Sequence, residues 1–235
     1  MDSQIAEDDG YAPLVIAPKT GDERLHIGKQ PLDKTLLDFW RWSASDLVSN
    51  AARGIFAEYI VANALGLASG IRVEWDAYDL VMPSGLKIEV KSAAYLQTWY
   101  HRKLSTIRFG IQPTRGWDSV TNELSLELKR QADVYVFCLL KHQDKASVDP
   151  LNLDQWEFYI LGASVLDATF PTQKSIGLSA LLRLNPCIAK YEAISSCVEK
   201  AQLVTSYAEF GEEDRLLVEE GIGEYARGLR TEDAT

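Results

Sequence analysis

The stretch WDAYDLVMPSGLKIEVKSAAYLQ, residues 75–97, decides the fold that this sequence predicts. Two strand-like segments in it are joined by Met82-Pro83-Ser84-Gly85, which has proline at the second turn position and glycine at the fourth. This arrangement suits a type I turn followed by a glycine in the left-handed region, the common three-residue hairpin loop. We therefore predict a β-hairpin.

The three-residue loop also fixes which residues of the hairpin face each other. The predicted pairs are Met82 with Leu86, Val81 with Lys87, Leu80 with Ile88 and Asp79 with Glu89. One face then carries only apolar side chains, as a half-buried hairpin requires. These side chains are Leu80, Met82, Leu86, Ile88 and Val90. The other face collects the charged residues Asp79, Glu89 and Lys91.

Asp79 and Glu89 pose an electrostatic problem in this register. Two carboxylates directly opposite each other, with Cβ atoms about 5 Å apart, repel unless a positive charge lies between them. A divalent cation such as Mg²⁺, which prefers hard oxygen ligands, would supply that charge, and Lys91 would place a fixed charge beside it. The alternative is that all three residues form a solvated strand face, and the hairpin alone does not decide between the two.

The preceding segment RGIFAEYIVANALG, residues 53–66, has the spacing of an amphipathic helix. We expect it to begin at Ser49 or Asn50 and to stop at Gly66. Its predicted apolar stripe contains Ile55, Glu58, Ala62 and Leu65. A carboxylate on such a stripe is costly without a partner, so Glu58 should have one. The alternative is a glutamate at the edge of the stripe, paired with Arg53 or with a lysine.

The order of these parts, a helix with Glu58 and then a hairpin with Asp79 and Glu89-Val90-Lys91, resembles the PD-(D/E)XK nuclease superfamily. Tyr78 stands where that family's name has proline. The resemblance implies metal-dependent hydrolysis of phosphodiester bonds, with Asp79, Glu89 and Glu58 holding Mg²⁺, or Mn²⁺ as a substitute. Lys91 would orient the attacking water and stabilise developing negative charge. Gln97, a polar residue shortly after that lysine, would contact the substrate.

Residues 84–117 carry six basic side chains against Glu89 alone, interleaved with aromatic ones. Basic groups neutralise phosphates and rings stack on bases, so we expect this segment to bind nucleic acid. These residues leave both DNA and RNA open, and DNA is the substrate we expect. The expected contacts are Arg102, Lys103 and Arg108. The alternative is that the rings belong to the core and the basic residues form a solvated rim. For Trp99 and Tyr100 the sequence does not decide.

The composition is that of a soluble globular protein, with 46% hydrophobic and 25% charged residues. A formal net charge of -10 argues against a protein that coats nucleic acid non-specifically. Without a long apolar run or a signal-peptide pattern, we expect a cytoplasmic protein with no membrane partner. Cys138, Cys187 and Cys197 lack the spacing of a metal site, and we expect reduced thiols.

The predicted fold class is α/β, with a restriction-endonuclease-like core in which helices flank a mixed central sheet. We divide the chain into an N-terminal arm and covering helix (1–48), the nuclease core (49–170), a C-terminal helical part of the same domain (171–208) and an acidic helical tail (209–235). The apolar run at 132–141 predicts a buried central strand. Further strands are predicted at 12–18, 71–75, 106–113 and 155–161, and helices at 33–46, 120–130 and 190–204.

The sequence suggests two kinds of partner, a protein bound by the acidic tail and a second copy of the chain. The tail from Glu209 has nine acidic residues against three arginines. It resembles the partner-wrapping segments of bacterial antitoxins, although a C-terminal helix on the parent domain is the simpler interpretation. Cleavage of both strands of a duplex would favour a homodimer. The alternative function is a catalytically silent restriction-endonuclease-like module that binds nucleic acid or a protein partner.

Overall fold

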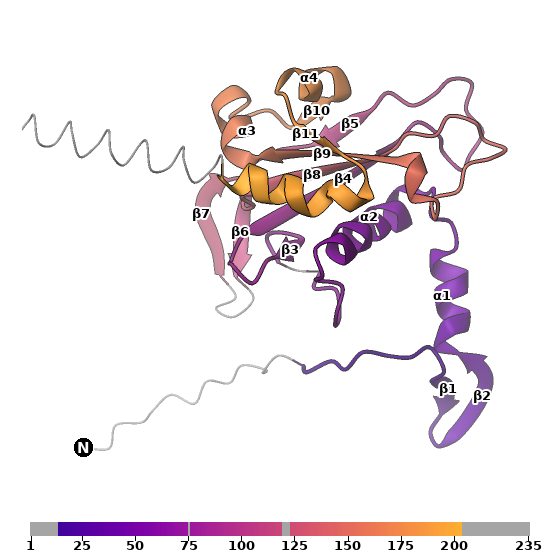
Figure 1. Ribbon diagram of the computed structural model, residues 1–235. Coiled ribbons are helices and arrows are strands. Elements are labelled where there is room, and N and C mark those ends of the chain that lie inside the picture. Colours follow the sequence, from indigo (N-terminus) through magenta and orange to yellow (C-terminus); the bar gives the residue numbers. More distant parts are fainter. Residues whose placement is uncertain (1–13, 75, 119–122, 204–235) are drawn as a thin grey trace, which may run out of the picture.

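The computed structural model describes residues 14–74, 76–118 and 123–203 (Figure 1). Its centre is a five-stranded sheet in the order β11-β9-β8-β4-β3. The strands are β3 (Leu80–Val81), β4 (Lys87–Ala94), β8 (Val134–Leu140), β9 (Trp156–Gly162) and β11 (Cys187–Ala189). β4 and β8 are parallel and the other pairs are antiparallel, so the predicted mixed sheet of an α/β fold is confirmed. The acidic tail lies outside the described residues.

The apolar run predicted as a central strand is β8, and all seven of its residues are buried. Alternate residues of β8 contribute to two separate cores because successive side chains point to opposite faces of the sheet. Val134, Val136 and Cys138 belong to one core, and Tyr135 and Phe137 belong to the other. A strand buried on both faces reads as a continuous apolar run.

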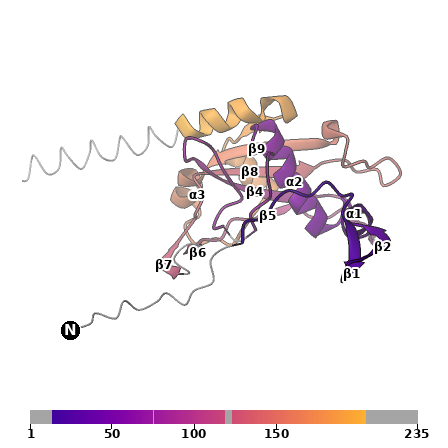
Figure 2. The ribbon, with the colours of Figure 1, turned by 90° about the horizontal axis from the view of Figure 1, so that it is seen from below.

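Helices cover the first face of the sheet, as Figures 1 and 2 show. They are α2 (Asn50–Ala64) and a helix over residues 194–203, which follows the short 3-10 turn η2 (Tyr191–Ala193). This confirms the helix predicted at 190–204, of which residues 194–203 are α-helical. α2 starts after Ser49 and ends before Gly66, whose positive φ of 71° is the left-handed conformation that a terminating glycine adopts.

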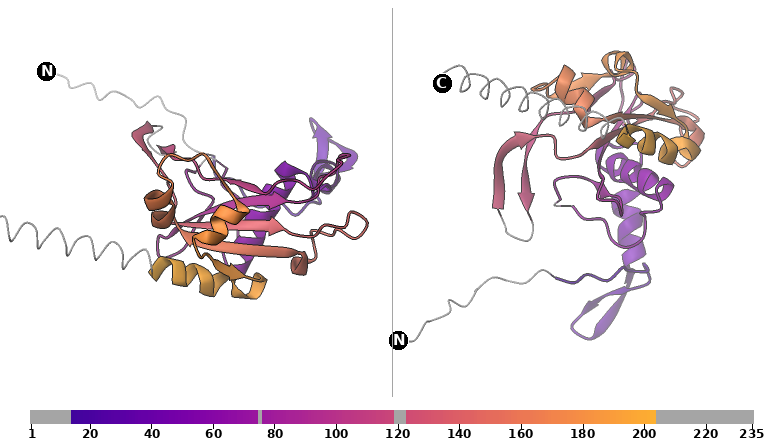
Figure 3. Two further views of the ribbon diagram at one scale, coloured as in Figure 1. Left: turned by 90° about the horizontal axis from the view of Figure 1, so that it is seen from above. Right: turned by 60° about the vertical axis from the view of Figure 1, so that its left-hand side comes forward.

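The second face is covered by shorter elements, seen above the sheet in Figure 1 and from above in Figure 3. β5 (Arg108–Gly110) pairs with β10 (Ser175–Gly177), and α3 (Ala163–Thr169) and α4 (Leu178–Arg183) lie beside them. The buried residues of these four elements, including Phe109, Leu166, Ile176 and Leu181, pack on β8 and β9 in the second core. A 3-10 turn, η1 (Leu153–Gln155), precedes β9, and its Leu153 packs against the first core.

The β3–β4 hairpin has the predicted register. Leu80 pairs with Ile88 and Val81 with Lys87, and the backbone N–H of Met82 donates to the carbonyl of Leu86 at 2.9 Å. Gly85 closes the loop with a φ of 87°, a conformation that side-chain-bearing residues rarely adopt. The apolar face predicted for this hairpin packs into the first core.

The N-terminal region differs from the prediction. Residues 14–18 form no strand and are exposed, whereas β1 (Arg24–Ile27) and β2 (Gln30–Thr35) form a hairpin that the sequence analysis missed. α1 (Leu36–Ala44) begins with a capping box between Thr35 and Asp38, but none of its residues is buried. It projects from the body together with β1 and β2 (Figure 1), so the expectation of a covering helix is wrong.

Two further predicted elements are also wrong. In place of a helix over 120–130, β6 (Thr114–Asp118) and β7 (Glu123–Lys129) form an antiparallel ribbon. The sequence of β7, ELSLELK, alternates apolar and polar residues, which is the period of a strand. Residues 71–74 form no strand. The strands predicted at 106–113 and 155–161 are confirmed as β5, which is shorter, and β9.

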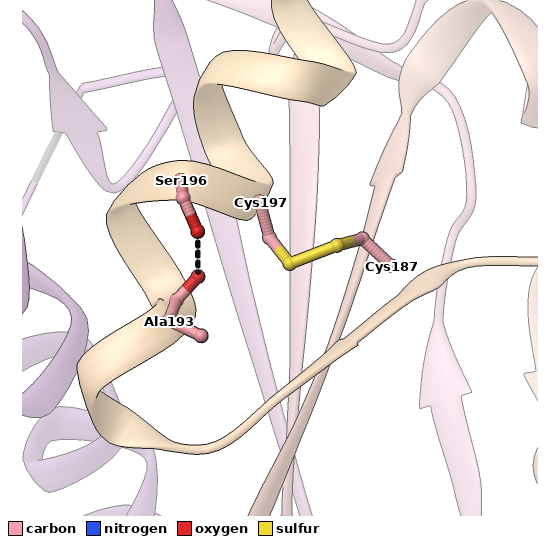
Figure 4. Close-up of a disulfide and its surroundings, with 4 residues drawn as sticks. All are labelled: Cys187, Ala193, Ser196 and Cys197. Atoms are coloured by element: carbon pink, nitrogen blue, oxygen red, sulfur yellow. Dashed lines mark hydrogen bonds between the residues drawn. A yellow bond between two sulfur atoms is a disulfide. The ribbon is translucent and has the colours of Figure 1, made fainter.

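The expectation of reduced cysteines is wrong for two of the three. Cys187 on β11 and Cys197 in the helix over 194–203 form a disulfide (Figure 4). The turn η2 reverses the chain between them and brings together two residues that are ten positions apart. The same turn region carries a hydrogen bond of 3.1 Å from the Ser196 hydroxyl to the Ala193 carbonyl. Cys138 is a free, buried thiol, as expected.

Candidate active site

Glu89 and Lys91 lie on β4 and share the face opposite to the α2 side, because Ile88 and Val90 between them enter the first core. The Lys91 ammonium forms a salt bridge with the Glu89 carboxylate. Both residues line a cavity of about 350 Å³. Tyr135, Gln131 and Lys174 also line this cavity, which we call the Lys91 cavity.

Asp79 lies next to this pair and is half-buried. Its Oδ2 accepts a hydrogen bond of 2.7 Å from the backbone N–H of Val90, which holds the carboxylate against β4. Burial raises the pKa of Asp79 to about 6, and the neighbouring charge of Glu89 adds to the increase. The hydrogen bond from Val90 acts in the opposite direction but does not outweigh these two effects. The carboxylates of Asp79 and Glu89 therefore repel each other.

Glu58 occupies a different position from the one expected. The buried face of α2 contains Arg53, Ala57, Ile60, Val61 and Ala62. Ile55 is 51% exposed, so the predicted stripe runs along the edge of this face. Glu58 forms a salt bridge with Arg72, which is neither of the partners considered from the sequence. Its charge still contributes to the raised pKa of Asp79.

The acidic residues meet the requirements of a metal site only in part. Within 14–74, 76–118 and 123–203, no group of three or more histidine, cysteine, aspartate or glutamate side chains is placed to hold a metal ion. Asp79 and Glu89 nevertheless offer two repelling carboxylates. Mg²⁺ in phosphoryl-transfer sites is commonly bound by one or two carboxylates, with water and substrate phosphates as the other ligands. These two residues fit such an ion, whereas Glu58 would first have to leave Arg72.

The four residues predicted to contact nucleic acid fall into two groups. Arg102, Lys103 and Arg108 are exposed. Gln97 is only 9% exposed, and its Nε2 donates to Ser105 Oγ at 3.1 Å. Gln97 thus holds the two ends of the loop that carries Arg102 and Lys103.

The open question about the aromatic residues has a mixed answer. Trp99 and Tyr100 are 56% and 83% exposed, so they belong to the surface of the loop after Gln97. Phe109, in contrast, is buried in the second core. The exposed basic residues of this loop therefore stand beside exposed rings.

Sequence reasoning missed three residues of the site. Arg72 and Lys174 gave no local signal, because only the fold brings them near the acidic residues. Tyr135 could have been found, since it is the one hydroxyl-bearing residue of the central strand and lies opposite Glu89 in the parallel β4–β8 register. Burial and the charge of Glu89 raise the pKa of Tyr135.

The mixed sheet, together with a cavity lined by Glu89 and Lys91 and flanked by Asp79, defines an α/β protein with a nuclease-like core. The family model of bacteriophage T4 endonuclease IV matches residues 32–178, and the chain belongs to this family. It is thus a member of a nuclease family, whose substrate class is nucleic acid. A comparison with curated proteins finds no match. No helix in the described part of the chain is long and apolar enough to cross a membrane.

Proposed function

We propose that the protein is a metal-dependent endonuclease with a PD-(D/E)XK-type site, and that its substrate is DNA. The observation that carries the proposal is the repelling pair Asp79 and Glu89 beside Lys91, of which Glu89 and Lys91 line the Lys91 cavity. A divalent cation would relieve this repulsion, and a phosphodiester would bring the remaining oxygen ligands.

Each residue has a distinct role in this proposal. Asp79 and Glu89 would hold Mg²⁺, and Glu58 would complete the site, directly or through a water, if it left Arg72. When bound, Mg²⁺ lowers the pKa of a coordinated water and offsets the charge of the scissile phosphate. Lys91, now paired with Glu89, would orient the attacking water and stabilise the developing negative charge. The salt bridge keeps this ammonium at the cavity before substrate binds.

The exposed loop after Gln97 supports nucleic acid as the substrate. Arg102 and Lys103 offer phosphate contacts, and Trp99 and Tyr100 offer rings on which bases can stack. These residues stand out in a chain with a net charge of -10. Such a chain has little general attraction for a polyanion, so binding would be confined to this basic region.

The first test is Mn²⁺ binding by calorimetry to the wild type and to Asp79→Ala and Glu89→Ala. We expect binding that disappears in both variants, because each removes one of two carboxylates. Asp33→Ala, which removes an exposed carboxylate from β2, is the matched control and should bind Mn²⁺ as the wild type does. The titration is repeated with an oligonucleotide whose phosphodiesters resist cleavage. If the wild type binds no Mn²⁺ in either experiment, the metal site is refuted.

A second candidate function is a catalytically silent module that binds nucleic acid or a protein partner. The observation in its favour is that Glu89 and Glu58 already have cationic partners within the chain, Lys91 and Arg72. Such a module needs no divalent cation. The same Mn²⁺ titration separates the two functions, since only the endonuclease requires the ion.

A further inference from the structure

A second pocket lies at the carboxyl end of β4, between the start of α2 and β5. Its volume is about 300 Å³, and the nine residues that line it include no carboxylate. Two of them are arginines, Arg53 and Arg108, and most of the others are small or polar. We call it the Arg53 pocket. The lining of this pocket is therefore positively charged, whereas the chain as a whole has a net charge of -10.

Arg53 is a buried cation in the lining of this pocket. It is only 4% exposed, and its guanidinium donates to the Val48 carbonyl at 2.6 Å and to Asn50 Oδ1 at 2.7 Å. Both acceptors are neutral. Among the residues that the structure describes, no carboxylate forms a salt bridge with Arg53, and its Nε has no hydrogen-bond partner. A buried cation whose hydrogen-bond acceptors are all neutral is costly, so an anion bound in the pocket would stabilise it.

Asp46 is the nearest acidic candidate for neutralising Arg53, since its charge acts on the guanidinium. Its carboxylate is engaged elsewhere, however. It accepts hydrogen bonds from the Thr98 hydroxyl at 2.8 Å and from the backbone N–H of Ser49 at 3.1 Å. Asp46 therefore ties together the loops around the pocket and leaves the guanidinium without a direct ionic partner.

The start of α2 adds to the positive potential of the pocket. The helix has 15 residues, Ser49 makes no side-chain capping bond, and the first turn contains no acidic residue. The amino end of a helix carries a partial positive charge and backbone N–H groups suited to an anion. Asn50, the first helical residue, lines the pocket.

We propose that the Arg53 pocket binds a backbone phosphate of the nucleic-acid substrate next to the scissile one. This inference rests on the proposed function and adds to it a subsite for the substrate backbone. Ser92, Ala93 and Ala94 of β4 line the pocket and directly follow Lys91. At about 3.3 Å per residue the far end of this segment is about 10 Å from Lys91, within reach of the same strand of nucleic acid.

The loop that carries the exposed rings leaves from the rim of this pocket. Gln97 and Ser105, which line the pocket, enclose the loop that contains Trp99 and Arg102. A strand held by its phosphate in the Arg53 pocket would continue over these side chains. Gln97 Oε1 has no partner among the described residues either, but it is an acceptor, and the proposal assigns it no contact with the phosphate.

Two variants and one control test the pocket. Arg53→Lys keeps the positive charge but removes the planar fork that pairs with phosphate oxygens. Arg108→Ala removes an exposed cation from the lining and should not disturb the fold. Arg183→Ala, an exposed arginine on α4 outside the pocket, is the matched control.

The first measurement is the melting temperature with and without inorganic pyrophosphate, in the absence of metal ions. Pyrophosphate should raise the melting temperature of the wild type and of Arg183→Ala, because a ligand that binds only the folded state stabilises it. It should raise that of Arg53→Lys and Arg108→Ala much less. If pyrophosphate shifts all four proteins equally, or none of them, the phosphate subsite is refuted.

The second measurement is binding and cleavage of a labelled DNA oligonucleotide. In EDTA, Arg108→Ala should bind several-fold more weakly, and the slope of log Kd against log salt should fall by about 1. With metal and subsaturating DNA, its cleavage should slow as its binding weakens, whereas Arg183→Ala should cleave as the wild type does. Equal DNA affinity and salt slope in Arg108→Ala and the wild type would overturn the subsite.

The two measurements separate this inference from the proposed function. A wild type that cleaves no nucleic acid, but whose pyrophosphate shift is lost in both variants, would keep the phosphate site and refute the nuclease. A wild type that cleaves DNA, with a pyrophosphate shift unaffected by either substitution, would keep the nuclease and refute the subsite.

Discussion

Asp79 is the acidic residue of the site whose pKa its surroundings raise. It is held by the Val90 N–H, repelled by Glu89 and Glu58, and half-buried between them. Burial has the largest effect, and the pKa of Asp79 rises from 3.8 to about 6. A cation bound to this carboxylate would offset the repulsion from Glu89 and Glu58. Asp79 is therefore the most informative single residue for testing the site.

The raised pKa of Asp79 predicts a pH dependence of stability in metal-free solution. The folded pKa lies above the unfolded value, so the contribution of Asp79 is fully present below about pH 4 and is lost as the pH rises through about 6. Relative to Asp79→Asn, the wild type should lose on the order of 2 kcal/mol over this range. Urea unfolding of both proteins between pH 4 and 7.5 measures the difference. Parallel curves would show that the carboxylate titrates normally.

Lys91 should matter for cleavage far more than for binding. Lys91→Ala should keep its affinity for DNA and lose cleavage by about 10²-fold or more, since the ammonium acts on charge that develops in the transition state. Lys141→Ala is a matched control, because Lys141 also forms a salt bridge with a nearby glutamate, Glu157, outside the Lys91 cavity. Single-turnover cleavage and binding in EDTA measure both quantities. Full activity of Lys91→Ala would remove its catalytic role.

At the scale of elements, the β3–β4 hairpin and α2 position the site. The hairpin loop sets the register that brings Asp79 next to β4, and the apolar sides of both elements pack in the first core. Local sequence predicted both elements well, because turn residues, caps and apolar periodicity act within a few residues of each other. The partners of their polar side chains depended on other parts of the chain.

Two glycines of these elements should respond oppositely to alanine. Gly85 has a φ of 87°, so Gly85→Ala should destabilise the protein by about 1 kcal/mol. Gly54 lies within α2 where an added Cβ would meet no atom within 4 Å. Gly54→Ala should therefore stabilise by up to about 1 kcal/mol. Urea unfolding of both variants measures these changes, and a stabilised Gly85→Ala would contradict the loop geometry.

At the scale of the whole molecule, charge is distributed unevenly along the chain. Residues 84–117 are basic and the segment from Glu209 is acidic. The arm formed by β1, β2 and α1 projects from the body (Figure 3). Its exposed aromatic side chains include Phe39 and Trp42. The family match begins at Leu32 and so includes α1, although this helix covers no core.

The acidic segment should weaken binding of nucleic acid. Deleting 209–235 should increase DNA affinity at low salt, because the segment carries nine acidic residues that compete with phosphates for the basic region. The difference should vanish near 1 M salt, where charges are screened beyond about 3 Å. A full-length variant with these acids changed to the corresponding amides should match the deletion. Affinities equal to the wild type at low salt would rule out the competition.

The sequence by itself determined the features that depend on neighbouring residues. The loop of the hairpin, the limits of α2 and the buried character of β8 followed from turn chemistry, capping and hydrophobic pattern, and Asp79, Glu89 and Lys91 followed from the hairpin register. Only the tertiary structure decided the pairing of Glu58 with Arg72 and of Cys187 with Cys197, and the exposed position of α1. The physical reason is that ion pairs, disulfides and burial depend on which distant segments meet, whereas turns and strand registers are fixed by steric constraints within a few residues.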